Sequence, residues 1–194
     1  MGAKKEIIFI TTNKDKVKEI QDLADAESKR IKIEHLEYDY PELQLAEIES
    51  VAKESANYIR EKMTIKKPFF LEDSGLLIHA LNGFPGPFSA FVFDKIGNEG
   101  ILKLMADKKG EERKATFKTV VAFCESRKAV PVLFVGTAEG EIAEEIRGGG
   151  GFGYDPIFEF EGTGKTFAEL STEEKNKISH RGRAFRKLLD YLSI

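Results

Sequence analysis

Four short polar segments divide the chain, and each one follows or interrupts an apolar stretch. They cover residues 11–16, 72–75, 151–156 and 179–182. Where a strand or helix gives way to polar residues, the backbone can face a ligand. The first segment follows residues 7–10, which are continuously apolar, as in a strand covered on both faces. The chain therefore opens as a strand, a loop and a helix, which favours an α/β fold.

The remaining periodicity supports a mixed sheet with flanking helices. Further strands are expected at residues 31–38, 69–71 continuing at 76–78, 115–124 and 130–136, and residues 137–146 could add a third strand to the last two. Helices are expected at residues 17–24, 48–63, 100–106 and 184–194. The chain contains no internal repeat and no low-complexity tract. We therefore expect residues 1–194 to form one domain with two lobes around a cleft.

Composition argues against several classes of partner. The 194 residues include 33 acidic and 30 basic side chains, a net charge of -3, so bulk charge indicates neither nucleic-acid nor membrane binding. Cys124 is the only cysteine, which excludes an intrachain disulfide and a cysteine-built metal site. Its apolar neighbours predict a core residue. The first residues resemble neither a signal peptide nor a membrane span, and we expect a cytoplasmic protein.

The first two polar segments each have a functional and a structural interpretation. Amides at a helix start favour anions, and Thr11, Asn13 and Lys16 could add contacts to a phosphate, or they could simply cap the helix. Glu72 and Asp73 follow a buried strand, so their side chains should point to opposite faces, and at most one should easily face a given cleft. A carboxylate there could hold Mg²⁺, accept a proton from water, or cap local amides.

The third and fourth segments offer contacts to a base. Phe152 and Tyr154 lie among closely spaced glycines and present aromatic faces on which a base could stack. Ser179 can cap the last helix, which would leave His180 in a first turn rich in donors. Lys175 lies five residues before His180 and would not share its face on one continuous helix. A bend is therefore expected between them if both serve one ligand.

Some polar residues have an ordinary structural interpretation when taken alone. Lys53 could reach a phosphate from the flank of its helix, but a surface pair with Glu49 one turn earlier is the simpler expectation. Glu42 is a candidate metal ligand, and it could equally be an exposed acid. His35 and His79 are expected to be structural, because a lone histidine is more often a surface or core residue than a catalyst.

Taken together, these segments resemble the inosine triphosphate pyrophosphatase family, which hydrolyses non-canonical purine nucleotides. The resemblance covers essentially the whole chain, and its motifs are highly specific in this order. They are Thr11-x-Asn13-x-x-Lys16, Pro41-Glu42, Lys53, Glu72-Asp73-Ser74-Gly75-Leu76, Gly83-x-Pro85-Gly86-x-x-Ser89-Ala90, Gly151-Phe152-Gly153-Tyr154-Asp155-Pro156-Ile157-Phe158, Glu173-Glu174-Lys175 and Ser179-His180-Arg181-Gly182. One departure is Thr12, where relatives often have Gly or Ser, and it adds bulk beside the phosphate loop.

The resemblance implies an elongated α/β fold with two lobes around a nucleotide cleft, usually a homodimer. It implies the reaction NTP + H₂O → NMP + pyrophosphate with Mg²⁺, acting on ITP, dITP and XTP and so removing deaminated purines from the nucleotide pool. Asp73 is then the catalytic acid–base residue and, with Glu42, a metal ligand. The residues implied to bind the purine nucleoside triphosphate are Thr11, Thr12, Asn13, Lys14, Asp15, Lys16, Lys53, Ser74, Phe152, Gly153, Tyr154, Asp155, Lys175, His180 and Arg181.

Two alternative functions stay open at this point. A related pyrophosphatase of the Maf-like type would act on other modified or standard nucleotides, although residues 179–182 favour the inosine type. A nucleotide sensor would bind without turnover, but Glu42, Asp73 and three candidate phosphate lysines argue against an inactive site. A pocket of donors would select the C6 carbonyl of hypoxanthine or xanthine, because each buried donor left unpaired by the adenine amine costs ~1–3 kcal/mol.

Overall fold

The computed structural model describes residues 5–27, 31–41 and 43–193. Its strands and main helices are β1 (Lys5–Ile10), α1 (Lys14–Glu27), β2 (Ile31–Leu36), α2 (Ile48–Lys62), β3 (Phe69–Ile78), α3 (Ser89–Leu104), β4 (Lys114–Cys124), β5 (Val132–Ile142), β6 (Phe158–Phe160), α4 (Thr172–Ile178) and α5 (His180–Leu192). The strands form a sheet in the order β2-β1-β3-β4-β5-β6. β1 runs parallel to β2 and β3, and the other neighbours are antiparallel. The predicted α/β fold with a mixed sheet is confirmed.

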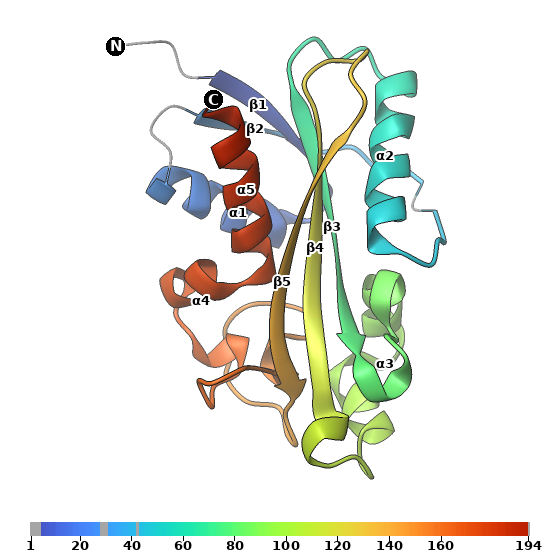
Figure 1. Ribbon diagram of the computed structural model, residues 1–194, viewed down its shortest axis with the longest axis vertical. Helices are drawn as coiled ribbons and strands as arrows, with labels where there is room; N and C mark the ends of the chain where they lie inside the picture. Colours follow the sequence, from blue (N-terminus) through green and yellow to red (C-terminus); the bar gives the residue numbers. More distant parts are fainter. Residues whose placement is uncertain (1–4, 28–30, 42, 194) are drawn as a thin grey trace.

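Helices lie on both sides of three long strands, β3, β4 and β5, which run along the long axis of the molecule (Figure 1). On one side, α5 packs against β4 and β5, and α1 contacts α5 and β2. On the other side, α2 covers β3 and β4, and α3 lies further along the same long axis. Within residues 5–27, 31–41 and 43–193, no helix combines the length and the apolar character needed to cross a membrane.

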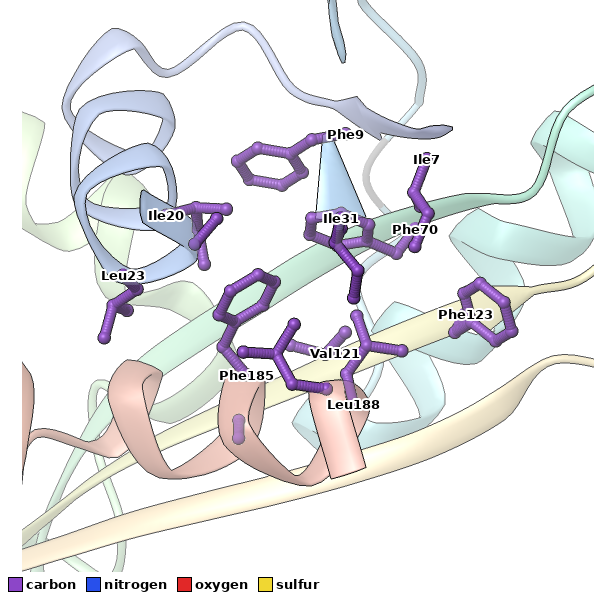
Figure 2. Close-up of a cluster of buried hydrophobic side chains, with 13 residues drawn as sticks. Ile7, Phe9, Ile20, Leu23, Ile31, Phe70, Val121, Phe123, Phe185 and Leu188 are labelled. Atoms are coloured by element: carbon purple, nitrogen blue, oxygen red, sulfur yellow. The ribbon is translucent and has the colours of Figure 1, made fainter. Parts of the chain in front are cut away.

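One part of the core lies between the sheet and the helices α1 and α5 (Figure 2). The rings of Phe9 and Phe70 stack with centroids 4.6 Å apart, and Phe185 of α5 lies 5.9 Å from Phe70. Ile20 and Leu23 of α1 complete this side of the cluster. Each buried side chain of this size contributes about 1.5–3 kcal/mol, so the cluster fixes α1 and α5 against the sheet. These two helices carry residues of the first and fourth polar segments.

The opposite face of the sheet has its own buried cluster, which joins α2 to β3 and β4. Ile48, Ala52 and Ile59 of α2 pack there with Leu71 and Cys124. Cys124 is fully buried, and burial raises the pKa of its thiol to about 11. The prediction that Cys124 is a core residue is therefore confirmed.

β5 continues to Ile142, whereas the sequence predicted a strand ending at Gly136 and a separate third strand after it. Both glycines inside β5 permit close approach of another backbone. A Cβ on Gly136 would lie 2.1 Å from the His180 oxygen, and a Cβ on Gly140 would lie 2.2 Å from the Glu159 oxygen. A glycine within a strand therefore marks packing against α5 and β6 here, and does not end the strand.

α3 begins at Ser89, eleven residues before the helix expected at residues 100–106. Ser89 Oγ donates to the main-chain oxygen of Gly86 at 2.7 Å and accepts from the amide of Leu76 at 2.9 Å. Gly97 interrupts the helix with a φ of 58°. The sequence signal was weak because apolar side chains of this helix, such as Phe91 and Ile96, are exposed, and because Gly97 breaks the periodicity.

The edge of β3 beyond β1 is open, and this geometry positions the site. β1 pairs with β3 only through Ile8–Phe69 and Phe9–Phe70, and β1 ends at Ile10. From residue 72 onward, β3 has β4 on one side and no described strand on the other until the isolated bridge between Leu77 and Pro85. The second polar segment therefore lies on a sheet edge, where Asp73 and Ser74 are partly exposed.

Candidate active site

A cavity of about 470 Å³ extends along the open edge of β3, between the loop before α1 and the start of α5. The predicted residues that line it are Thr11, Thr12, Asn13, Asp15, Lys16, Asp73, Ser74, Phe152, Gly153, Tyr154, Asp155, His180 and Arg181. Lys14 and Lys53 are exposed and lie outside this lining, and Lys175 is buried in an ion-pair cluster. The prediction for Glu42 falls outside the described residues. The structure thus brings together residues from all four polar segments.

The loop before α1 supports both interpretations of the first polar segment. Asn13 caps the helix, because its Oδ1 accepts from the amides of Asp15 at 2.9 Å and Lys16 at 3.1 Å. Thr11 Oγ1 accepts from the Asn13 amide at 3.1 Å, and the Thr11 carbonyl lies 2.9 Å from His35 Nε2. A carbonyl only accepts, so His35 donates through Nε2, which confirms its structural role. The segment also lies at the helix end that favours anions.

Glu72 and Asp73 both border the cavity, but the Glu72 side chain is fully buried and only that of Asp73 is partly exposed, which agrees with the expectation that at most one would easily face it. Glu72 is buried, and its Oε1 lies 2.8 Å from Lys16 Nζ and 3.3 Å from Arg181 Nη2. Asp73 is half-buried, and its Oδ1 accepts from the Ser74 amide at 3.0 Å. Lys16 Nζ also donates to the main-chain oxygen of Glu72 at 3.3 Å. Glu72 is therefore part of the buried ion pairs, and Asp73 is the carboxylate with access to the cavity.

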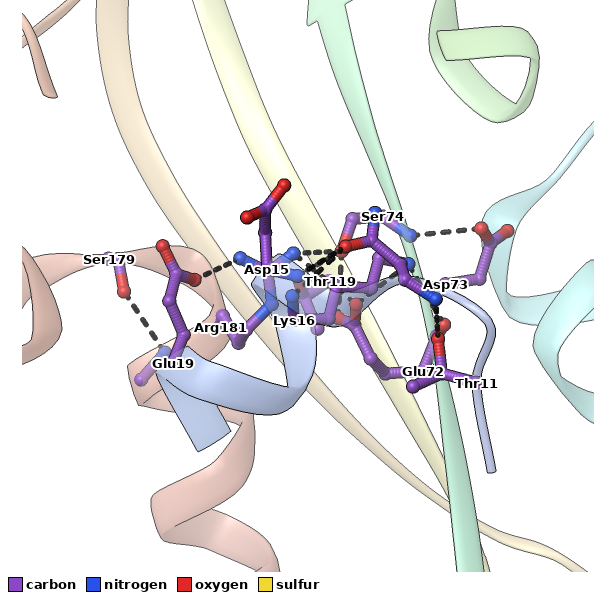
Figure 3. Close-up of polar contacts among 12 residues, drawn as sticks. Thr11, Asp15, Lys16, Glu19, Glu72, Asp73, Ser74, Thr119, Ser179 and Arg181 are labelled. Carbon is purple, nitrogen blue, oxygen red and sulfur yellow. Dashed lines mark hydrogen bonds and ion pairs between the residues drawn. The ribbon is translucent and has the colours of Figure 1, made fainter. Parts of the chain in front are cut away.

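A buried network of ion pairs connects α1, β3, α4 and α5. Lys175 Nζ lies 2.6 Å from Glu19 Oε1 and 2.7 Å from Asp155 Oδ2. Arg181 forms an ion pair with Glu19 and also contacts Glu72, as Figure 3 shows. An unpaired charge in such a place would cost several kcal/mol. The pairs therefore hold these four elements at a fixed separation around the cavity.

The charge states in this network follow from competition between burial and neighbouring charges. Burial opposes ionisation of Glu19 and Glu72, but the charges of Arg181 and a nearby lysine outweigh it and lower the pKa of both carboxyls. For Asp155, burial outweighs Lys175 and raises the pKa of the carboxyl. Burial alone would lower the pKa of Arg181, but Glu72 and Glu19 raise it on balance. Arg181 is therefore a permanent cation at the cavity wall.

His180 is a buried, neutral side chain at the start of α5. Its ring stacks on Phe117 with centroids 4.5 Å apart, and burial followed by the charge of Arg181 lowers its pKa well below the ordinary value. Nδ1 has no hydrogen-bond partner within residues 5–27, 31–41 and 43–193. Ser179 separates α4 from α5 and accepts from the Gly182 amide at 3.1 Å. The predicted cap and bend are both confirmed.

The glycine-rich loop before β6 supplies the aromatic wall of the cavity. The Phe152 ring lies 5.2 Å from the guanidinium carbon of Arg181, close enough for a cation–π contact. Tyr154 donates its hydroxyl to the Ser89 carbonyl at 3.0 Å. Its ring meets Phe93 of α3 edge to face, with centroids 5.2 Å apart. Phe152 therefore places its ring against the cations Arg181 and Lys175 at the cavity wall.

The carboxylates of the cavity suit a divalent metal that arrives with its ligand. Within the described part of the chain, no three His, Cys, Asp or Glu side chains gather as a metal site. Mg²⁺ is usually held by one or two carboxylates together with substrate phosphates and water, so it needs no such cluster. Asp73 on the β3 edge supplies one carboxylate that borders the cavity, next to the anion-favouring start of α1. The donor chemistry of the cavity therefore fits Mg²⁺.

Sequence reasoning missed four residues that shape the site. Glu19 lies three residues after Lys16 on the buried stripe of α1, and a charged residue on that stripe was a detectable signal. Asp39 and Tyr40 follow β2, and they line the cavity because the carboxyl ends of the parallel strands β1 and β2 meet at one edge. Phe93 of α3 also lines it, but no sequence pattern set it apart from the neighbouring aromatics.

Comparisons with known proteins agree with this geometry. The model of the Ham1 family matches residues 7–191. The chain is 48% identical over 188 residues to the dITP/XTP pyrophosphatase of Methanosarcina mazei, covering 96% of each chain, and 50% identical over 187 residues to that of Methanopyrus kandleri, covering 96% of this chain and 95% of the other. The solved structure of a HAM1 protein from Coxiella burnetii has a TM-score of 0.81 at 33% identity, covering 97% of this chain and 98% of that one. This chain belongs to the Ham1 family.

Proposed function

We propose that this protein is a Mg²⁺-dependent nucleoside triphosphate pyrophosphohydrolase. It converts ITP, dITP and XTP to the monophosphate and pyrophosphate, and so removes deaminated purines from the nucleotide pool. The observation that carries the proposal is that one cavity joins a helix start and Lys16, the carboxylate of Asp73, and the side chains of His180 and Arg181. The names of the archaeal relatives, dITP/XTP pyrophosphatase, support the substrate class.

The triphosphate would bind at the start of α1. The hydroxyl of Thr11 lies beside the end of the helix that attracts anions, where Asn13 Oδ1 already caps the amides of Asp15 and Lys16. Lys16 contributes a charge that Glu72 holds at 2.8 Å, so the lysine is already oriented towards the cavity. Lys53 is exposed on α2, and it would have to reach the phosphates from the flank. Pre-oriented cations stabilise the charge that develops on phosphate oxygens during hydrolysis.

Asp73 would act on the water that attacks the triphosphate. Together with Glu42 it would hold Mg²⁺, which neutralises charge on the phosphates when bound. The Ser74 amide fixes one oxygen of Asp73 at 3.0 Å, so the carboxylate has a defined orientation on the edge of β3. From there it orients the water and accepts its proton as the anhydride between the α- and β-phosphates breaks and pyrophosphate leaves.

The base would be selected at the other end of the cavity. Phe152 offers a face for stacking, and Arg181 and neutral His180 offer donors. The C6 carbonyl of hypoxanthine or xanthine accepts from such donors, whereas the adenine amine leaves them unpaired. Glu19 holds the Arg181 guanidinium, so the donor cannot easily turn away to avoid a mismatch. Rigid donors therefore favour deaminated purines.

We further propose that the protein is a homodimer, that each chain forms one domain and that the protein is cytoplasmic. The first half of α3 and the loop before it expose Phe84, Phe88, Phe91 and Ile96, with Phe91 64% exposed, and this apolar surface supports a homodimer. The family match over residues 7–191 supports one catalytic domain. A substrate drawn from the nucleotide pool fits a cytoplasmic location. Sedimentation of a Phe91→Glu variant tests the dimer: a monomer is expected, and an unchanged dimer would contradict the use of this surface.

The experiment that tests the reaction is product analysis with dITP and Mg²⁺. The proposal expects one dIMP and one pyrophosphate per dITP consumed, with neither dIDP nor inorganic phosphate. Release of inorganic phosphate and dIDP would show a different phosphohydrolase. Binding of dITP with no product of either kind would favour the nucleotide sensor.

A further inference from the structure

We propose that Thr119 of β4 is a positioning residue of this site. Its buried hydroxyl acts through Ser74 to fix the carboxylate of Glu72, and Glu72 in turn holds Lys16 and Arg181. The inference deepens the proposed function and rests on it. Thr119 does not line the cavity, so it does not touch the substrate.

The geometry places Thr119 directly beside the second polar segment. β3 and β4 are antiparallel, and Thr119 is the register partner of Ser74. Thr119 is fully buried, and its Oγ1 lies 2.6 Å from Ser74 Oγ. Ser74 Oγ lies 2.8 Å from Glu72 Oε2, and Figure 3 shows the three side chains grouped at the centre of the polar contacts.

The direction of these hydrogen bonds follows from the charge of Glu72. Its Oε1 lies 2.8 Å from Lys16 Nζ and 3.3 Å from Arg181 Nη2, and two cations at these distances keep it ionised. An ionised carboxylate only accepts, so Ser74 must donate its single hydroxyl hydrogen to Glu72. Ser74 therefore accepts from Thr119, and Thr119 is the donor. The hydrogen bonds are therefore donated in one direction, from Thr119 to Ser74 and from Ser74 to Glu72.

These hydrogen bonds give the two carboxylate oxygens of Glu72 different partners. Ser74 occupies Oε2 of Glu72, which leaves Oε1 to both cations. Lys16 lies at the phosphate end of the cavity and Arg181 at the base end, so the orientation of one carboxylate sets the position of both. Loss of the Thr119 hydroxyl would leave the longer contact from Arg181 Nη2, at 3.4 Å, as the one donor to Ser74 Oγ among the described residues, so Ser74 would hold Glu72 less firmly.

The neighbours of Thr119 make its hydroxyl hard to explain by packing alone. The residues that follow it, Val120 and Val121, are fully buried and apolar. A buried hydroxyl without a partner costs about 1–3 kcal/mol in proteins, so valine would be the natural occupant if only packing mattered. Thr116, on the same strand, uses its hydroxyl differently: it donates to Glu139 at 2.6 Å, outside the cavity.

The experiment compares Thr119→Val with Thr119→Ser and with Thr116→Val as a matched control on the same strand. Pyrophosphate release from dITP and urea denaturation are measured for each. We expect kcat/KM to fall about tenfold in Thr119→Val, the kinetic equivalent of one hydrogen bond, with the protein still folded. Thr119→Ser should restore most of the loss, and Thr116→Val should match the wild type. If the wild-type protein hydrolyses dITP and Thr119→Val has the same kcat/KM, the inference is overturned. If the wild-type protein itself does not hydrolyse dITP, the proposed function is overturned instead.

A double-mutant cycle with Ser74→Ala separates positioning from simple packing. If Thr119 acts through Ser74, then Thr119→Val should have little further effect on kcat/KM in the Ser74→Ala background. An additional full tenfold loss there would refute the chain of hydrogen bonds. If Thr119→Val does not fold, Thr119→Cys, with its weak S–H donor, should give an intermediate kcat/KM, and wild-type activity in it would count against the proposal.

Discussion

The Gly136→Ala substitution should displace the start of α5, and with it the base-binding end of the cavity. Gly136 lies in the middle of β5, where the added Cβ would be 2.1 Å from the His180 oxygen and 2.5 Å from the Ala184 nitrogen. Both are backbone atoms of α5, so a side-chain rotation cannot relieve the contact. The helix must move by about 1 Å to restore a van der Waals separation.

The cost of this movement can be estimated from its two consequences. Overpacking a tight interior site typically costs about 1–3 kcal/mol of folding stability. The displacement also carries Arg181 away from Glu19 and Glu72, and a misplacement of about 1 Å can cost about a hundredfold in turnover. We therefore expect the free energy of unfolding to fall by about 1–3 kcal/mol and kcat/KM to fall by up to about a hundredfold.

Urea denaturation and pyrophosphate release from dITP measure the two effects. Gly149→Ala is the matched control, because a Cβ at Gly149 meets no heavy atom within 4 Å. That variant should keep the stability and activity of the wild type. A Gly136→Ala protein within about 0.5 kcal/mol of the wild type, with unchanged kcat/KM, would refute the close packing of α5 on β5.

Three further substitutions test the site. Asp73→Asn should leave the urea midpoint nearly unchanged and lower kcat by orders of magnitude, and near-normal turnover would remove Asp73 from its role. Glu19→Gln should lower the unfolding free energy by about 3 kcal/mol, since Lys175 and Arg181 each lose one buried partner; an unchanged denaturation curve would contradict the network. His180 is neutral when folded, so below pH ~6.5 only its unfolded state gains a proton, and stability should fall by about 1 kcal/mol from pH 7 to 5.5. His180→Gln should reduce this dependence of stability on pH, and an equal dependence in both proteins would argue against a neutral His180 in the folded state.

Hydrophobic periodicity predicted most of the strands because each one is buried on at least one face. It divided β5 at Gly136, because the sequence does not distinguish a glycine that ends a strand from a glycine that lets another backbone approach closely. It also placed the helix after Pro87 too late, because Gly97 interrupts its pattern. These differences come from contacts between distant segments, which a local pattern does not encode.

The site was predictable where polar residues follow apolar runs, and less so where partners come from elsewhere. The cap by Asn13 and the break at Ser179 depend on neighbours within three residues, and both were predicted. The access of Asp73 to the cavity depends on where β1 ends, which strand alternation alone does not show. The burial of Lys175 required Glu19 of α1, which is far away in the sequence.

The most direct test of the central claim is the substrate preference of pyrophosphate release at saturating Mg²⁺. The assay compares kcat/KM for dITP, ITP and XTP with kcat/KM for dGTP, GTP and ATP. If the donors at the start of α5 select the C6 carbonyl, the deaminated purines should exceed ATP by about a hundredfold or more, as two unpaired buried donors imply. Equal values for all the nucleotides would contradict the account, because a rigid pocket of donors could not then be what selects the base.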